Sequence, residues 1–214
     1  MRTLSLVTAA ALIAGLPMLA SAGESPWVVK LGASYVKPKS QNGDSDLKAT
    51  VATLGVTNPS IEVSKEYNLT PSIEYLISDT LSTEVLLALP FSHDVKTNGI
   101  KIGEFKHLPP TVTVKYRMAG KEGFLPYVGV GLNYTKTWGE TAVGPIAGNA
   151  LSASDSFGPA VLIGAEYRPA GSQWGVAADL RYIKIKSDLK LNGSKIGALE
   201  VDPLVLGVSA VYHY

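Results

Sequence analysis

The sequence predicts an all-β protein, an eight-stranded antiparallel up-and-down transmembrane β-barrel, and three observations support this prediction. Apolar and polar residues alternate with period two along eight segments, as they do in strands with two different faces. The connections between these segments are alternately short and long. Aromatic residues gather at both ends of the apolar faces. Unequal connections and two aromatic belts are typical of transmembrane barrels.

The front of the chain predicts export. Arg2 precedes an apolar run from Leu4 to Leu19, which ends in the small-residue stretch Ala20-Ser21-Ala22. This is the pattern of a secretory signal peptide. Gly15 and Pro17 argue against the alternative, a membrane anchor helix, because both weaken a spanning helix. The predicted domains are a signal peptide over residues 1–22 and a barrel over residues 23–214.

Each amphipathic segment has the length of a membrane strand. The segments lie near residues 27–37, 66–77, 81–91, 107–117, 124–135, 155–168, 174–185 and 203–214. Tight turns are expected around residues 78–80, 119–123 and 169–173. Long connections rich in Gly, Asn, Ser and Asp cover residues 38–65, 92–106, 136–154 and 186–202. No segment shows a helical period, so these connections are expected to be loops.

The aromatic residues decide between a membrane barrel and a soluble barrel of the lipocalin type, which would turn its apolar face inward. At the short-turn ends of the strands the apolar face carries Trp27, Tyr75, Tyr116, Phe124, Tyr167, Trp174 and Tyr214. At the other ends it carries Tyr35, Tyr67, Phe91, Tyr134, Phe157 and Tyr182. Because Tyr and Trp prefer membrane–water interfaces, two such belts at two heights favour the membrane barrel.

The opposite face of the strands predicts the contents of the lumen. Charges of both signs cluster near the short turns, at Lys30, Glu74, Glu84, Lys115, Arg117, Glu166, Arg168, Asp179 and Arg181. The half near the long connections is mostly apolar, with Val36, Ala88, Pro90, Pro109, Thr111, Leu162, Ile183 and Val205. Buried charges must pair. We therefore expect a plug of ion pairs in the lower lumen and an apolar cup above it, which either receives a ligand or only fills space.

The last strand predicts how the barrel closes. Residues 206–214, LGVSAVYHY, alternate strictly and end in Tyr214. An unpaired strand edge invites aggregation. In a closed barrel, the segment 203–214 pairs with the segment 27–37 and no edge remains.

Five stretches resemble the OmpW/AlkL family of outer-membrane proteins. They are LLALPFSHDV, HLPPTVTVKYR, PYVGVGLNYT, DLRYIKIKSDL and VDPLVLGVSAVYHY, in the family's order and through most of the chain after residue 22. The resemblance implies an eight-stranded barrel in the outer membrane of a Gram-negative bacterium. It also implies passage of small hydrophobic compounds, which leave through the barrel wall. Family members usually end in Phe, and Tyr214 is expected to keep the ring that the barrel-insertion machinery recognises.

Three prolines predict where a molecule leaves the lumen sideways. Proline has no N–H and leaves a flaw in the hydrogen-bond ladder. Pro90 lies near the upper end of the third segment, and Pro109 and Pro110 open the fourth. The resemblance also links lateral exit to a wall proline. The predicted opening is therefore the wall between the third and fourth strands, unless these prolines only end strands at the bilayer rim.

Several function classes are disfavoured. A net charge of +1 gives no reason to expect a nucleic-acid partner, and without cysteine there are no disulfides. His93, His107 and His213 lack metal-ligand spacing, and neighbours in a strand such as Ser92 and His93 point to opposite faces. No enzyme, metal or cofactor is expected.

Three functions stay open: a passive conduit for small hydrophobic molecules, a structural or adhesive barrel, and a membrane enzyme acting on lipids. The conduit is favoured, because the upper lumen is apolar. The expected partners are outer-membrane lipids, small hydrophobic molecules and the barrel-assembly machinery.

Overall fold

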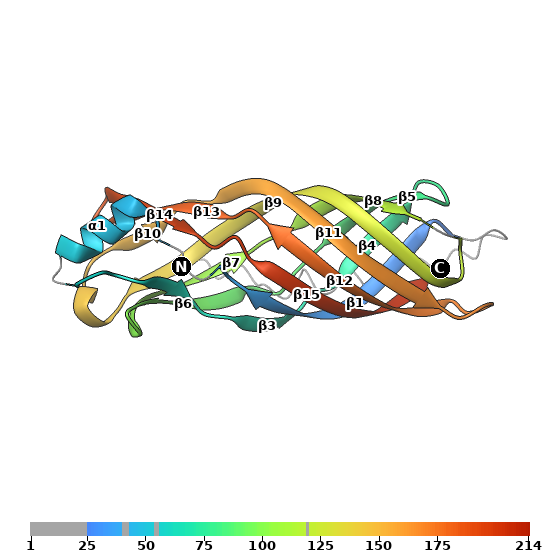
Figure 1. The fold of residues 1–214 in the computed structure, drawn as a ribbon, viewed down its shortest axis with the longest axis horizontal. Helices are drawn as coiled ribbons and strands as arrows, with labels where there is room; N and C mark the ends of the chain where they lie inside the picture. The colour runs from blue at the N-terminus through green and yellow to red at the C-terminus, as the bar shows by residue number, and fades with distance from the viewer. Residues whose placement is uncertain (1–24, 40–42, 54–55, 119) are drawn as a thin grey trace, which may run out of the picture.

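The wall of the molecule is a closed barrel of eight antiparallel strands, which confirms the predicted fold class (Figure 1). The computed structural model describes residues 25–39, 43–53, 56–118 and 120–214, so the predicted signal peptide lies outside the described residues. In chain order the eight wall strands are β1 (Trp27–Lys37), β3 with β4 (Glu66–Leu69, Ser72–Leu76), β5 with β6 (Leu81–Leu86, Phe91–Thr97), β7 with β8 (Ile100–Leu108, Thr111–Arg117), β9 (Gly123–Ala142), β11 (Ser156–Arg168), β12 (Trp174–Ile183) and β15 (Leu204–His213).

The barrel closes between its first and last strands. β1 pairs with β15 from Val28 opposite His213 to Lys37 opposite Leu204. β9 pairs with both β8 and β11, which joins the two halves of the sheet. The whole lower wall is therefore hydrogen-bonded around its circumference, as a strand structure in lipid requires.

The four long connections are not loops, and that expectation was wrong. They carry the wall strands upward into a cap made of α1 (Ser45–Thr53), β2 (Ile61–Val63), η2 (Gly144–Ile146), β10 (Leu151–Ala153), β13 (Lys186–Leu191) and β14 (Ser194–Glu200). β10, β13 and β14 form a separate three-stranded sheet. In Figure 1 the cap lies at the end of the long axis opposite the C-terminus.

The helix α1 was missed because its pattern is short. It buries only Leu47 and Val51, a single apolar pair with helical spacing. Its start is fixed by Asp44, whose Oδ1 accepts the Leu47 N–H at 2.8 Å and whose Oδ2 accepts the Ala198 N–H at 3.0 Å. The carboxylate thereby ties the helix to β14. Among the described residues, no helix has the length and hydropathy to cross a membrane.

The two aromatic belts face outward with one exception. Phe91, predicted in the upper belt, is 3% exposed and faces the lumen. Leu86 pairs with Thr111, but Phe91 pairs with His107. Between these two pairs, the four residues 87–90 of the third wall strand lie opposite the three residues 108–110 of the fourth, as in a bulge. The extra residue shifts the alternation by one, so Leu89 points outward and Phe91 inward.

Replacing Tyr214 with alanine is expected to lower the yield of folded barrel. The Tyr214 N–H donates to Trp27 on β1 at 3.2 Å, and its ring packs edge-on against Tyr212 with centroids 4.9 Å apart. The variant loses this belt contact where the first and last strands pair. The heat-modifiable fraction on gels of outer membranes measures the effect. Tyr116→Ala, which changes a belt residue away from this pair of strands, is the control. An equal loss for both variants would contradict a special role of Tyr214.

Candidate functional site

The lower lumen is filled by a network of ion pairs. Lys115 Nζ lies 2.5 Å from Glu74 Oε2 and 2.9 Å from Glu84 Oε2, and Lys30 Nζ contacts the same two oxygens at 2.7 and 3.2 Å. These four residues come from β1, β4, β5 and β8, so their side chains converge from four neighbouring strands. All four are buried. Burial is tolerable here because each charge faces opposite charges.

Two further pairs extend the network across the lumen. Arg117 Nη2 lies 2.8 Å from Glu166 Oε2, and Arg181 Nη2 lies 2.6 Å from Glu84 Oε1. Arg181 also contacts Asp179 at 2.9 Å. Arg168 lies apart from these pairs, because its guanidinium donates to the backbone carbonyl of Lys121 near the short turns.

Two residues that sequence reasoning left out complete the network. His213 Nε2 lies 2.6 Å from Glu166 Oε1. The Tyr127 ring lies 4.5 Å from Lys115 Nζ and 5.3 Å from Lys30 Nζ. A cation gains from an aromatic face in a dry site. We call this filled region, with Lys30, Glu74, Glu84, Lys115, Arg117, Glu166, Asp179, Arg181 and His213, the plug.

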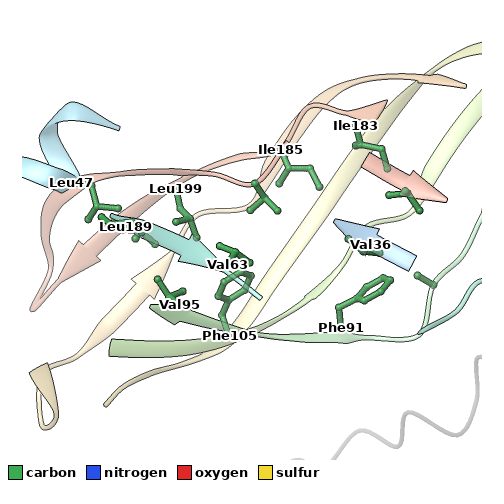
Figure 2. Close-up of a cluster of buried hydrophobic side chains, with 14 of the residues drawn as sticks. Val36, Leu47, Val63, Phe91, Val95, Phe105, Ile183, Ile185, Leu189 and Leu199 are labelled. Atoms are coloured by element: carbon green, nitrogen blue, oxygen red, sulfur yellow. The ribbon is translucent and has the colours of Figure 1, made fainter. Parts of the chain in front are cut away.

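Above the plug the interior is mainly apolar, with a few buried polar side chains such as Asn133 and Thr135. Val36, Ala88, Ile183 and Val205, all predicted for the cup, belong to one buried cluster that continues into the cap. Figure 2 shows this cluster running from Val36 and Ile183 past Phe105 to Leu47 and Leu199. Pro109, Thr111 and Leu162 are also buried, and Pro90 is partly exposed.

The cap encloses a cavity of about 180 Å³, which we call the chamber. Its wall is mainly aliphatic, with Leu47, Val51, Val56, Ile61, Val95, Ile102, Phe105, Ile146, Leu151, Leu189, Leu191 and Ile196 among its lining residues. A smaller cavity is lined by Phe105, His107, Ile185 and Leu199. Phe105 and Ala153 line both spaces, so they stand between the two.

A cluster of four rings lies where the cap meets the barrel. The His93 and His107 centroids are 4.8 Å apart, and both rings lie within 6.0 Å of Phe91 and within 5.7 Å of Phe105. Burial lowers the pKa of the His93 imidazole, so this ring is neutral at pH 7. Among the described residues, no group of three or more potential metal ligands forms a site.

The wall between the third and fourth strands is interrupted at one height. The β5–β8 ladder ends at Leu86 and Thr111, and the β6–β7 ladder starts at Phe91 and His107. Between them lie residues 87–90 and 108–110, all described by the structure, and no backbone hydrogen bond joins these two segments. We call this interval the seam. Pro90, Pro109 and Pro110 all lie in it.

The segments on both sides of the seam form backbone hydrogen bonds with the wall strands on their other sides. Leu87 and Leu89 donate their N–H groups to Pro71 and Leu69 of the second wall strand, at 2.9 and 3.2 Å. On the other border, the Tyr134 N–H of the fifth wall strand donates to the Pro110 carbonyl at 3.1 Å. The third strand is thus bonded to the second and the fourth to the fifth, while the seam between the third and fourth stays unbonded.

Two asparagine side chains satisfy carbonyl groups along the seam. Asn68 Nδ2 donates to the carbonyls of Leu89 and Pro90, at 2.9 and 3.3 Å. Asn133 Nδ2 donates to those of Pro109 and Pro110, at 3.1 and 3.2 Å. An unsatisfied carbonyl in an apolar setting is costly. These amides supply hydrogen bonds that a ladder would otherwise give.

Proline alone does not open the wall. Pro159 lies within β11, and the pairing of β11 with β9 runs without a register shift from Ser156 to Arg168. What distinguishes the seam is the combination of prolines with the extra residue on the third wall strand. Ser92 and His93 point to opposite faces, exposed and buried, so they form no relay.

Comparisons with known proteins place the chain among small outer-membrane barrels. The OmpW family model matches residues 23–214. Outer membrane protein W of Vibrio cholerae is 31% identical over 223 residues, which cover 94% of this chain and 98% of that protein. The dibenzothiophene metabolism operon protein PahQ of Pseudomonas aeruginosa is 25% identical over 171 residues, covering 78% of this chain and 77% of that protein.

The crystal structure of the outer membrane protein OprG from Pseudomonas aeruginosa has the same fold. It matches with a TM-score of 0.74 at 22% sequence identity, and the match covers 89% of this chain and 97% of that one.

Proposed function

We propose that this chain, which belongs to the OmpW family and is an outer-membrane β-barrel, gives passive passage to small hydrophobic molecules through the cap and sideways into the bilayer. The observation that carries the proposal is the position of the unbonded seam beside an apolar interior and above a plug of ion pairs.

The first step of the proposed path is entry through the cap. The chamber offers an apolar wall outside the membrane, and the apolar cluster continues from it to Ala88, at the seam. A hydrophobic molecule gains roughly 25 cal/mol for each Å² of apolar surface that leaves water. One relative of the chain is named for a dibenzothiophene metabolism operon, and dibenzothiophene is an apolar aromatic molecule. That name supports the same substrate class here.

The second step is exit through the wall. The plug obstructs an axial route, since an apolar molecule cannot replace the partners of its buried charges. At the seam no ladder bond has to break before the strands move apart. A molecule that leaves there enters the hydrocarbon layer directly. The proposal involves no chemistry, cofactor or metal, and its partners are the transported molecule and the surrounding lipid.

Replacing Pro90 with alanine is expected to slow uptake. Leu89 directs its N–H to the second wall strand, so in extended backbone the next residue directs its N–H to the fourth. An alanine N–H at position 90 therefore points across the seam and can form the missing bond. Because one such bond contributes roughly 0.5–1.5 kcal/mol, uptake should fall by about two- to tenfold. The measurement is the rate at which intact cells carrying each variant take up naphthalene.

Pro110→Ala is the matched control. The Pro110 carbonyl accepts from Tyr134 of the fifth wall strand, so an alanine N–H at position 110 points away from the seam. This variant should take up naphthalene at the normal rate, and both variants should keep normal abundance and heat-modifiability. Equal uptake by Pro90→Ala and the unmodified protein would place the exit elsewhere. Equal uptake by cells with and without the protein would leave the structural or adhesive role.

A further inference from the structure

His93 has a nitrogen without a partner in the lumen. Its side chain is 1% exposed, and its Nε2 has no hydrogen-bond partner among the described residues. Buried polar side-chain atoms nearly always have one. The residue lies on the inward face of β6, two positions from Val95, which lines the chamber. A donor group on a molecule bound next to this ring would satisfy the unpaired atom.

The other ring nitrogen fixes what that ligand must offer. His93 Nδ1 lies 2.8 Å from the backbone carbonyl of Ser64. A carbonyl oxygen only accepts, so Nδ1 must carry the proton and donate. In a neutral imidazole the other nitrogen then holds a lone pair and accepts. His93 Nε2 is therefore an acceptor, and its partner has to be an O–H or N–H group.

The residues around His93 indicate that the remainder of the ligand should be apolar. The ring is enclosed by Phe91, Phe105 and His107, with centroids 6.0, 5.7 and 4.8 Å away. Phe105 also lines both the chamber and the smaller cavity. Polar side chains also line these spaces, among them Thr97 in the chamber and His107 and Thr135 in the smaller cavity, but most of the lining is aromatic or aliphatic. Because His93 Nε2 can only accept, it matches an apolar molecule with one donor group.

We propose that His93 selects, among small hydrophobic molecules, those that carry a hydroxyl group, such as phenols and apolar alcohols, by accepting a hydrogen bond at Nε2. This selection rests on the proposed function and narrows its substrate class. A pure hydrocarbon leaves the nitrogen unsatisfied, whereas a hydroxylated one satisfies it without burying a further charge.

A matched pair of probes tests the selection. 1-Naphthol and naphthalene share the same rings and differ by one hydroxyl group. Binding of each is measured by fluorescence with the purified full barrel in lipid nanodiscs, and binding to empty nanodiscs is subtracted. We expect 1-naphthol to bind more tightly by roughly five- to a hundredfold, the range for satisfying one buried polar group. Equal affinity for the two probes would overturn the selection and leave the proposed function intact. Failure of both probes to bind would overturn both.

Two variants test whether the preference for 1-naphthol depends on His93 Nε2. His93→Phe keeps a ring in the cluster and removes the acceptor, so the preference for 1-naphthol should vanish while naphthalene still binds. Naphthalene binding also reports that this variant is folded. Thr97→Val removes the hydroxyl of Thr97, the other unpartnered polar atom on the inward face of β6, and should leave the preference unchanged. Loss of the preference in Thr97→Val, or its survival in His93→Phe, would overturn the assignment.

Discussion

Replacing Lys115 with methionine is expected to lower the free energy of unfolding by roughly 3–5 kcal/mol, the range for breaking a buried ion pair on one side. Lys115 is fully buried and lies between Glu74 and Glu84, at 2.5 and 2.9 Å. Methionine has a similar length and no charge. The variant leaves Lys30 as the one cation that contacts both carboxylates, while Arg181 still contacts Glu84. Glu74 and Glu84 then repel each other with less positive charge between them to offset the repulsion.

Arg117→Ala should destabilise the barrel less than Lys115→Met. Arg117 has one close carboxylate partner, Glu166 at 2.8 Å, which keeps His213 at 2.6 Å when Arg117 is gone, whereas Lys115 has two close carboxylate partners. Lys195→Met is the surface control, since Lys195 pairs with Asp188 in a solvent-exposed pair. Exposed pairs contribute roughly 0–1 kcal/mol. Urea titration of the refolded barrel, followed by tryptophan fluorescence, measures all three. A change for Lys115→Met as small as that for Lys195→Met would show that the plug does not stabilise the fold.

The barrel was predictable because a membrane strand is constrained on both faces. Period two places Lys115 and Arg117 on one face of the fourth strand and Val114 and Tyr116 on the other. The structure has the same division. Lipid on one side and a narrow lumen on the other leave few other solutions for such alternation.

The wrong predictions concern residues where the regular alternation of a membrane strand is interrupted. Phe91 was assigned to lipid because its parity matches that of Leu87 and Leu89, and one extra residue in the third wall strand reverses the parity. A bulge has no reliable signature in a single sequence. Pro90 was a signal that the ladder is interrupted there, but not that the side chains beyond it change face.

The upper part of the molecule was harder to predict for a different reason. The cap lies outside the lipid, so its outer faces are not required to be apolar, and its strands look like polar loops. The chamber depends on packing between segments distant in sequence, such as α1 against β14. His213 was missed because it lies on β15 and its partner Glu166 lies on β11, and β12 runs between these two strands. Only the register of the closed barrel brings the two side chains together.

Ala153→Trp is expected to reduce naphthalene uptake to the level of cells without the protein. Ala153 lines both the chamber and the smaller cavity, so a large side chain there obstructs the proposed path between them. The chamber, at about 180 Å³, gives the indole ring an apolar space to occupy. Filling such a space adds contacts without forcing the core apart, so the barrel should keep its resistance to urea.

The control for this variant is the neighbouring residue of the same strand. Ser152 is exposed on the opposite side of β10, so Ser152→Trp adds the same ring outside the path. Uptake should be normal in Ser152→Trp and lost in Ala153→Trp, with equal amounts of both proteins in the outer membrane. Normal uptake in Ala153→Trp would mean that molecules reach the seam without passing through the chamber, for instance from the lipid side. Entry would then have to be sought in the wall itself, and the chamber would be left without a part in transport.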